Sequence, residues 1–283
     1  MKKNAALVFA GWIAAATLLA GCSDIPLLEP KGPVGAAELS IMVISLALML
    51  IVVIPVMVMA VWFPFRYQAS NPKGDYAPRW SHSHRIDLIV WLVPTIIVAA
   101  LGILNWKETH RLDPFAPIAP TEKQINIEVV SLDWKWLFIY PELNIATVNR
   151  LVFPANVPVS FKLTSDTVMS SFFIPQLGSQ IYAMPGMQSR LHLLASEPGV
   201  YFGQNQQFSG RGYADMHFSV TVTSQKQFDA WVQETRQLPD KLDPARLQAL
   251  YQPNIAYPAT SFSWVENNLF DEIMHKYRTP MAK

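Results

Sequence analysis

Two long hydrophobic stretches dominate the N-terminal third of this 283-residue chain. No charged residue occurs between Leu39 and Phe65, or between Leu88 and Trp106. A helix needs roughly 20 apolar residues to cross a bilayer, so the pattern predicts two transmembrane helices, at 38–65 and 87–107. The alternative is a helix pair buried in a soluble core, and runs this long and this free of charge disfavour it.

A shorter apolar stretch, Ala5–Leu18, follows the basic start Met1-Lys-Lys, as in a secretory signal. It ends in Leu19-Ala-Gly-Cys22, which looks like a bacterial lipobox. This predicts a lipoprotein signal peptide at 1–21 and acylation of Cys22. An ordinary signal peptide with a chance Cys, and an uncleaved third helix, remain open. Residues 22–37 are rich in Pro and predict an extended periplasmic tether.

The connection between the two long stretches, residues 66–86, is strongly basic. Its charged residues between Arg66 and Arg85 are four bases against one acid: Arg66, Lys73, Arg79 and Arg85 against Asp75. By the positive-inside rule this loop is cytoplasmic, which places everything after Trp106 in the periplasm. An exported, lipidated Cys22 agrees with that topology. We expect a multi-pass protein of the bacterial inner membrane, in contact with membrane lipid.

From Gln124 onward the pattern changes to short alternating runs. These are Ile125–Val130, Trp134–Tyr140, Val157–Leu163, Arg190–Leu194, Gly199–Phe202 and His217–Val222. Alternation with a period of two, interrupted at prolines, predicts an antiparallel β sandwich or barrel at 121–225.

The C-terminal extension, 226–283, has a helical pattern. Ser224 is a candidate N-cap for a first helix, and Asp243 begins a second. The aromatic-rich segment Tyr257–Phe270 indicates either a protein or lipid contact surface, or a small independent core. The sequence does not choose between these two interpretations.

Composition narrows the class further. The chain is 51% hydrophobic and 15% charged, which excludes a disordered protein. A net charge of +1 argues against a nucleic-acid partner. Cys22 is the single cysteine, so there is no disulfide framework.

Two segments, Ser165–Gly178 and Pro198–Met216, resemble the copper-binding segments of subunit II of haem-copper oxidases. In that family the first segment reads Asp-Val-x-His-Ser-Phe-x-Val-Pro. The second reads Gly-x-Tyr-x-Gly-x-Cys-x-Glu-x-Cys-Gly-x-x-His-x-x-Met. Pro175 sets the register of the first segment, and Tyr201 and Gly210 set that of the second.

In this register the copper ligands of the family are replaced at every position except one. The aligned positions, in chain order, are Ser170, Asn205, Gln207, Ser209, Tyr213 and Met216. Only Met216 keeps the residue of the family. A mixed-valence copper pair needs bridging thiolates and imidazoles. We therefore expect a vestigial site without metal.

The resemblance points to the quinol oxidase branch, the bo-type ubiquinol oxidases. It implies two transmembrane helices, a cupredoxin-like Greek-key barrel and a subunit with no catalytic or redox centre of its own. The complex it implies oxidises ubiquinol, reduces dioxygen to water and translocates protons. Subunit I of that complex would hold two haems and one copper, with subunits III and IV as further partners.

A cytochrome c partner is not expected. Residues 121–225 carry seven acidic and six basic residues, so they offer little steering to a basic carrier protein.

Three further residues have candidate roles. The family places a Glu near the mouth of a proton-uptake channel, at the position of Asp87, which is otherwise an ordinary helix cap. Trp134 and Trp136 match an aromatic strand on the family's electron path, and without copper we expect them to pack or to dock against subunit I. His82 and His84 lack a third ligand and are interpreted as solvated.

Two alternatives from other functional classes remain. One is a cytochrome c oxidase subunit II with an altered metal site. The other is a stand-alone, membrane-anchored cupredoxin-like binding or assembly protein.

Overall fold

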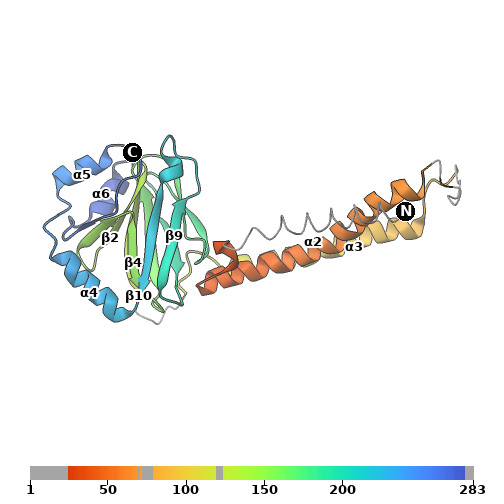
Figure 1. Cartoon of the computed structure of the whole chain (residues 1–283), viewed down its shortest axis with the longest axis horizontal. Coiled ribbons are helices and arrows are strands. Elements are labelled where there is room, and N and C mark those ends of the chain that lie inside the picture. Colours follow the sequence, from red (N-terminus) through yellow and green to blue (C-terminus); the bar gives the residue numbers. More distant parts are fainter. Residues whose placement is uncertain (1–24, 69–70, 72–78, 119–123, 278–283) are drawn as a thin grey trace, which may run out of the picture.

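The computed structural model describes residues 25–68, 71, 79–118 and 124–277. The signal peptide at 1–21 and the acylation site Cys22 lie outside these residues. Helices α2 (Pro33–Arg66) and α3 (His84–Arg111) form a hairpin that extends from one edge of a β domain (Figure 1). Both are long and apolar enough to span a membrane, and their most apolar windows are unburied within the chain.

The helices begin and end differently from the predictions of 38–65 and 87–107. The segment expected as a tether contains the 3-10 turn η1 (Pro26–Leu28), and α2 already begins at Pro33. Proline is favoured in the first helical turn, because its φ suits the helix and its missing N–H needs no partner there. Gly35 and Ala37 are buried, so the first turns of α2 have packing partners that the apolar pattern does not reveal.

The β domain contains two sheets. The strand orders are β11-β3-β2-β1-β5-β8 in the six-stranded sheet and β4-β10-β9-β6-β7 in the five-stranded sheet. The strands are β1 (Ile125–Leu132), β2 (Lys135–Tyr140), β3 (Ile145–Val148), β4 (Arg150–Pro154), β5 (Val159–Ser165), β6 (Ser170–Phe173), β7 (Gln180–Ala183), β8 (Ser189–Leu193), β9 (Gly199–Asn205), β10 (His217–Thr223) and β11 (Thr260–Phe262). The element between β9 and β10 is the 3-10 turn η2 (Tyr213–Asp215).

The predicted sandwich is confirmed, but two of its strand pairs are parallel and not antiparallel. β1 pairs with β5 in parallel, and β10 pairs with β4 in parallel. Strands that are neighbours in a sheet but distant in sequence are typical of Greek-key connections. Alternation in the sequence shows only which side chains are buried, and it carries no information on which strand lies next to which.

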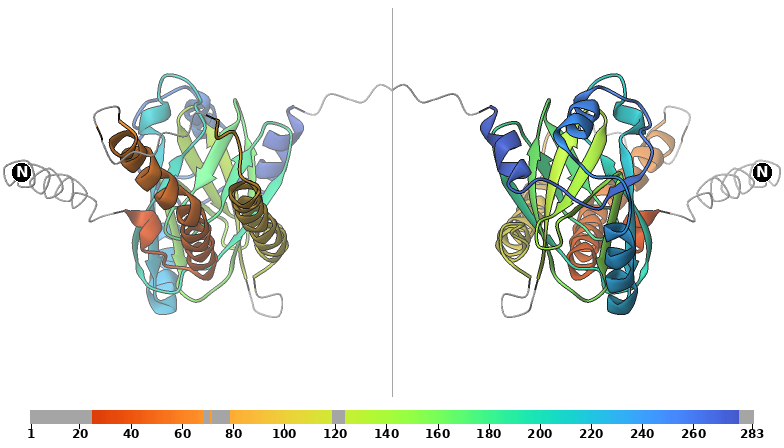
Figure 2. Two further views of the ribbon diagram at one scale, coloured as in Figure 1. Left: turned by 90° about the vertical axis from the view of Figure 1, so that its right-hand side faces the viewer. Right: turned by 90° about the vertical axis from the view of Figure 1, so that its left-hand side faces the viewer.

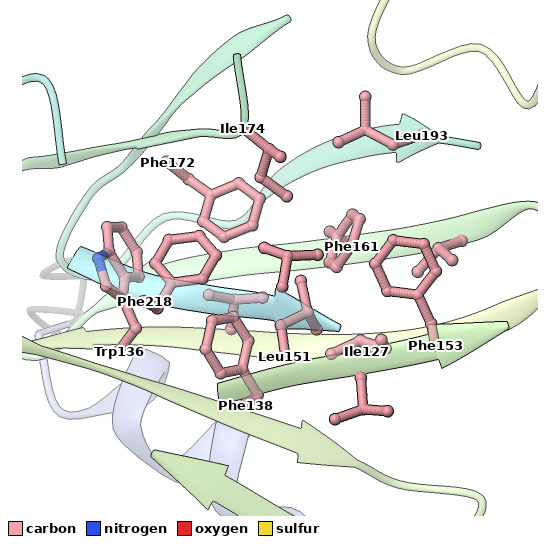
Figure 3. Packing of buried hydrophobic residues seen from close by; sticks show 14 of the residues in the cluster. Ile127, Trp136, Phe138, Leu151, Phe153, Phe161, Phe172, Ile174, Leu193 and Phe218 are labelled. Carbon is pink, nitrogen blue, oxygen red and sulfur yellow. The ribbon is translucent and has the colours of Figure 1, made fainter. Parts of the chain in front are cut away.

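The main core lies between the two sheets and is rich in aromatic rings (Figure 3). The rings of Phe172 and Phe218 stack at 5.2 Å, and the ring of Trp136 meets that of Phe172 edge-on at 5.4 Å. Trp136 is 0% exposed, so the expectation that it lies at an interface is wrong. Residues in a strand alternate between faces, and Trp136, Phe138 and Tyr140 all point inward on β2.

The C-terminal extension forms a second core against the outer face of the six-stranded sheet. The elements of the extension are α4 (Gln225–Arg236), α5 (Pro244–Tyr251), β11 and α6 (Leu269–His275). The buried hydrophobic residues of α4 pack in the main core, and the other three elements build the second core. Phe262 and Phe270 of the extension pack with Leu137 and Ile139 of β2. The aromatic-rich segment is therefore neither an independent core nor a wholly exposed surface, and β2 is buried on both faces.

The predicted helix starts in the extension are confirmed. Ser224 and Gln227 form a reciprocal capping box at the start of α4. Asp243 caps α5 by accepting a hydrogen bond from the backbone N–H of Arg246.

Candidate functional site

The six positions aligned with copper ligands lie at one end of the sandwich. Ser170 begins β6, Asn205 ends β9, and Met216 lies between η2 and β10. Gln207 and Ser209 belong to the loop that joins β9 to η2. Asn205, Ser170 and Met216 are buried, with 4%, 1% and 2% exposure.

The side-chain amide of Asn205 occupies the centre of this end. Its Nδ2 donates to Ser209 Oγ at 3.0 Å and to Met216 Sδ at 3.3 Å. Its Oδ1 accepts from the backbone N–H groups of Ser171 at 2.8 Å and Gln207 at 3.0 Å. Both amide hydrogens and both oxygen lone pairs of Asn205 therefore have partners.

Ser170 faces a different neighbour. Its hydroxyl accepts a hydrogen bond from Ser131 Oγ, across the sandwich on β1, at 2.7 Å. The Ser170 side chain thus joins the two sheets, whereas the backbone N–H of the next residue, Ser171, reaches Asn205 on the neighbouring strand β9.

Gln207 and Tyr213 take part less directly. Gln207 contributes its backbone N–H to Asn205. The ring of Tyr213 contacts that of Phe208 at 5.8 Å between centroids. The structure thus brings Asn205, Ser209 and Met216 into direct contact, and places Ser170, Gln207 and Tyr213 around them.

Trp134 supports the loop above this network. Its indole Nε1 donates to the carbonyl oxygen of Ser209 at 2.8 Å. Its ring also packs against two glycines, and a Cβ added at Gly212 would lie 2.5 Å from the ring. Trp134 is half-buried and holds the Ser209 loop in place, which is a packing role within this chain.

The donor set does not fit a copper pair. The central groups are an amide, a hydroxyl and a thioether, whereas copper pairs need thiolates and imidazoles. The Met216 sulfur already accepts a hydrogen bond from Asn205. Among the residues that the structure describes, no group of three or more His, Cys, Asp or Glu side chains is placed to hold a metal ion.

An ion pair ties the C-terminal extension to this end of the sandwich, and no sequence pattern predicts it. Lys276 Nζ lies 3.0 Å from Asp166 Oδ1, and the Tyr277 hydroxyl donates to the Asp166 backbone carbonyl. Burial raises the pKa of Asp166, and the ion pair with Lys276 opposes that rise. Asp166 belongs to the first aligned segment, but nothing in the sequence marks Lys276 as its partner.

A second such contact involves Lys135, which is 0% exposed. Its ammonium group donates to the carbonyl oxygens of Asp133 at 2.8 Å and Gln252 at 3.0 Å. Burial lowers the pKa of Lys135. Because Gln252 follows α5, this lysine fastens the extension to β2.

Asp87 lies far from this network, in the first turn of α3, and is exposed. A carboxylate is favourable at the N-terminus of a helix. The rings of His82 and His84 lie edge-on at 5.0 Å just before it, and both are exposed.

Comparisons with family models and with individual known proteins point to the same family. Residues 120–224 match the model of the cytochrome c oxidase subunit II periplasmic domain, and residues 236–281 match the COX aromatic-rich motif. The chain is 50% identical to the cytochrome bo(3) ubiquinol oxidase subunit 2 of Pseudomonas putida, over 92% of this chain and 82% of that protein.

Two further relatives agree with this match. Identity is 49% to the subunit of the same name in Pseudomonas aeruginosa, over 94% of this chain and 80% of that one. It is 45% to the ubiquinol oxidase subunit 2 of Acetobacter aceti, over 96% of this chain and 89% of that one.

Proposed function

The chain belongs to the subunit 2 family of ubiquinol oxidases, and we propose that it serves its complex without carrying electrons itself. The proposal rests on one observation: the amide of Asn205 uses all of its hydrogen-bonding capacity on neighbouring protein groups. The motif alignment assigns this position to a bridging thiolate of the family. Electrons then reach the oxygen-reducing subunit from a quinol dissolved in the bilayer, without a relay in this domain.

Subunit I is the proposed main partner. Long apolar stretches of α2 and α3 have no cover from the rest of the described chain, so neighbouring helices or lipid must surround them. The resemblance assigns two haems and one copper to subunit I, and adds subunits III and IV to the complex.

The proposed orientation places the β domain in the periplasm and the loop between α2 and α3 in the cytoplasm. The support is the basic character of residues 66–86. We further propose that Cys22 is acylated after removal of residues 1–21. Two membrane helices already anchor the chain stably, so an acyl chain would add little to membrane binding and its loss should be tolerated.

Asp87 is proposed to contribute to proton uptake by subunit I. In the proposed orientation its exposed carboxylate lies at the cytoplasmic end of α3, where it can exchange protons with water. It is one methylene shorter than the family's Glu.

A Met216→Leu substitution tests the central proposal. Met216 is the one position that keeps a copper-ligand residue type, and Leu conserves its volume. We expect the purified complex to keep its copper-to-haem ratio and its rate of quinol oxidation. A fall in copper content together with the rate of oxygen reduction would show that this domain holds a redox metal, and would overturn the proposal.

A further inference from the structure

Exposed apolar side chains gather where the helix pair meets the β domain. Three belong to η1 and its preceding residue: Ile25, Leu27 and Leu28 are 37%, 39% and 48% exposed. Two more lie near the end of α3: Trp106 is 70% exposed, and Phe115 in the following loop is 54% exposed. Figure 1 shows η1, in red, at this junction.

The two groups lie beside the same helix ends. Pro114, Ala116 and Ile118 of the loop after α3 line one cavity of about 220 Å³ together with Pro33 and Val34 at the start of α2. Figure 2, viewed along the helix pair, shows η1 next to α2 and the loop leaving α3 on the other side.

This junction lies at the depth of the lipid headgroups. Helix α2 has 34 residues, which at 1.5 Å per residue is about 51 Å, against a hydrocarbon thickness of about 30 Å. Its first charged residue is Glu38, one residue before the charge-free run. The first turns of α2, and η1 beside them, therefore lie at the membrane boundary on the side of the β domain.

Hydrogen bonds fix the position of η1 relative to the domain. The backbone N–H of Lys31 donates to Gln176 O at 2.7 Å, and its carbonyl accepts from Ser196 N at 2.8 Å. This residue joins two loops of the β domain, so η1 is held on the domain rather than free to move away from the membrane.

The start of α2 is held equally tightly. Gly35 N donates to Leu177 O at 3.0 Å, and the Glu38 carboxylate accepts from both the backbone N–H and the hydroxyl of Ser179. Gly178 has a φ of +98°, and a Cβ there would lie 2.7 Å from Gly35 N. These polar groups at the start of α2 thus bond to the β domain and hold the helix against it.

Basic and aromatic side chains at the junction suit a headgroup layer. The ring of Trp106 lies tilted at 42° to that of His110, with 4.4 Å between the centroids, and Lys107 and Arg111 belong to the same last turns of α3. Tryptophan concentrates at membrane interfaces because its ring is apolar while its N–H needs water or a headgroup.

We propose that Ile25, Leu27, Leu28, Trp106 and Phe115 form an interfacial collar that inserts into the lipid leaflet on the side of the β domain. The partner is the boundary between headgroups and acyl chains. Because Lys31, three residues after η1, is bonded to two loops of the domain, insertion of the collar sets the depth and tilt of the whole β domain. This role of the collar is separate from the proposed function. It applies whether the β domain lies on the periplasmic or the cytoplasmic side of the membrane.

The test measures how deep two collar positions lie in the oxidase complex reconstituted into phosphatidylcholine nanodiscs. Leu28→Cys and Phe115→Cys each receive a nitroxide spin label. Collision with dissolved oxygen, which concentrates in lipid, is compared with collision with a water-soluble nickel chelate. Leu238→Cys is the matched control, because Leu238 is an apolar side chain, 40% exposed, that follows α4 on the side of the β domain away from the helix pair (Figure 1). Unsubstituted complex labelled in parallel gives the background from other cysteines.

Labels at 28 and 115 are expected to collide mainly with oxygen, and the label at 238 mainly with the nickel chelate. Equal nickel collision at all three positions would place the collar in water and overturn the proposal. Protection of 28 and 115 from both reagents would also overturn it, because it would show that another protein subunit covers the collar.

Discussion

Asn205→Ala is the substitution that tests most directly whether the hydrogen bonds of Asn205 stabilise this end of the sandwich. It removes an oxygen that accepts from Ser171 N–H and Gln207 N–H, at 2.8 and 3.0 Å. Ser171 is 0% exposed, so water cannot replace the lost partner without local opening. A buried donor left without a partner costs about 1–3 kcal/mol.

The two orphaned donors together predict a loss of about 2–4 kcal/mol in the free energy of unfolding, with Gln207 at the lower end because it is half-buried. For a folded unit of this size, 1 kcal/mol corresponds to roughly 2–4 °C in Tm. We therefore expect a fall in Tm on the order of 10 °C, measured by near-ultraviolet circular dichroism of the purified chain in detergent.

Two controls separate the amide from its surroundings. Gln206→Ala changes an exposed neighbour that contributes only its backbone N–H, to Ser171 O, and should alter stability by less than about 0.5 kcal/mol. Ser209→Ala removes one of two acceptors of Asn205 Nδ2 and should cost about 1 kcal/mol. If Asn205→Ala were no more costly than Gln206→Ala, the network would not be what stabilises this end of the sandwich.

Four further predictions follow from the same structure. A variant that restores the copper ligands of the family should be a purple copper-binding domain, because three of the central positions already touch. It carries Cys at positions 205 and 209, His at 170 and 213, and Glu at 207. Failure of the correctly folded variant to take up copper would count against the register. Asp87→Ala should slow oxygen reduction without changing haem content, and an unchanged turnover would remove Asp87 from the proton path. Gly212→Ala should destabilise the chain by about 1–3 kcal/mol, because its Cβ meets the ring of Trp134 at 2.5 Å, whereas Gly102→Ala, with no atom within 4 Å of its Cβ, should not. The pKa of Lys135 is lowered in the folded chain, so between that pKa and 10.5 the unfolded chain binds more protons than the folded chain. The free energy of unfolding should therefore rise with pH in this window, and Lys135→Met should abolish the rise.

Much of the architecture could be predicted from local patterns. The membrane helices follow from charge-free runs, and both helix starts in the extension follow from Ser224 and Asp243, because an N-cap acts within a few residues of chain. The short strands β3, β4, β6 and β7 were not predicted. Two of them, β3 and β4, are separated by a single residue, Asn149, with a φ of +54°, and a hydrophobic pattern does not reveal so tight a turn.

The candidate site was predictable in its chemistry but only partly in its geometry. The positions Ser170, Asn205, Gln207, Ser209, Tyr213 and Met216 came from motif spacing, and three of them meet. Spacing could not show that Ser170 faces Ser131, because that contact joins strands 39 residues apart in the chain. It also could not show that Trp136 is buried and Trp134 half-buried, which depends on the position of Trp134 in the turn between β1 and β2.

The sequence by itself determined the class of protein: two apolar helices, a β domain and a set of neutral side chains where a copper pair would need thiolates. Those properties depend on residue type and local spacing, and both can be read directly from the amino-acid sequence. Only the tertiary structure decided which groups satisfy the amide of Asn205, how the extension covers β2 and how the segment after η1 is bonded to the β domain through Lys31. These are contacts between distant segments, and their partners are set by the packing of the whole fold.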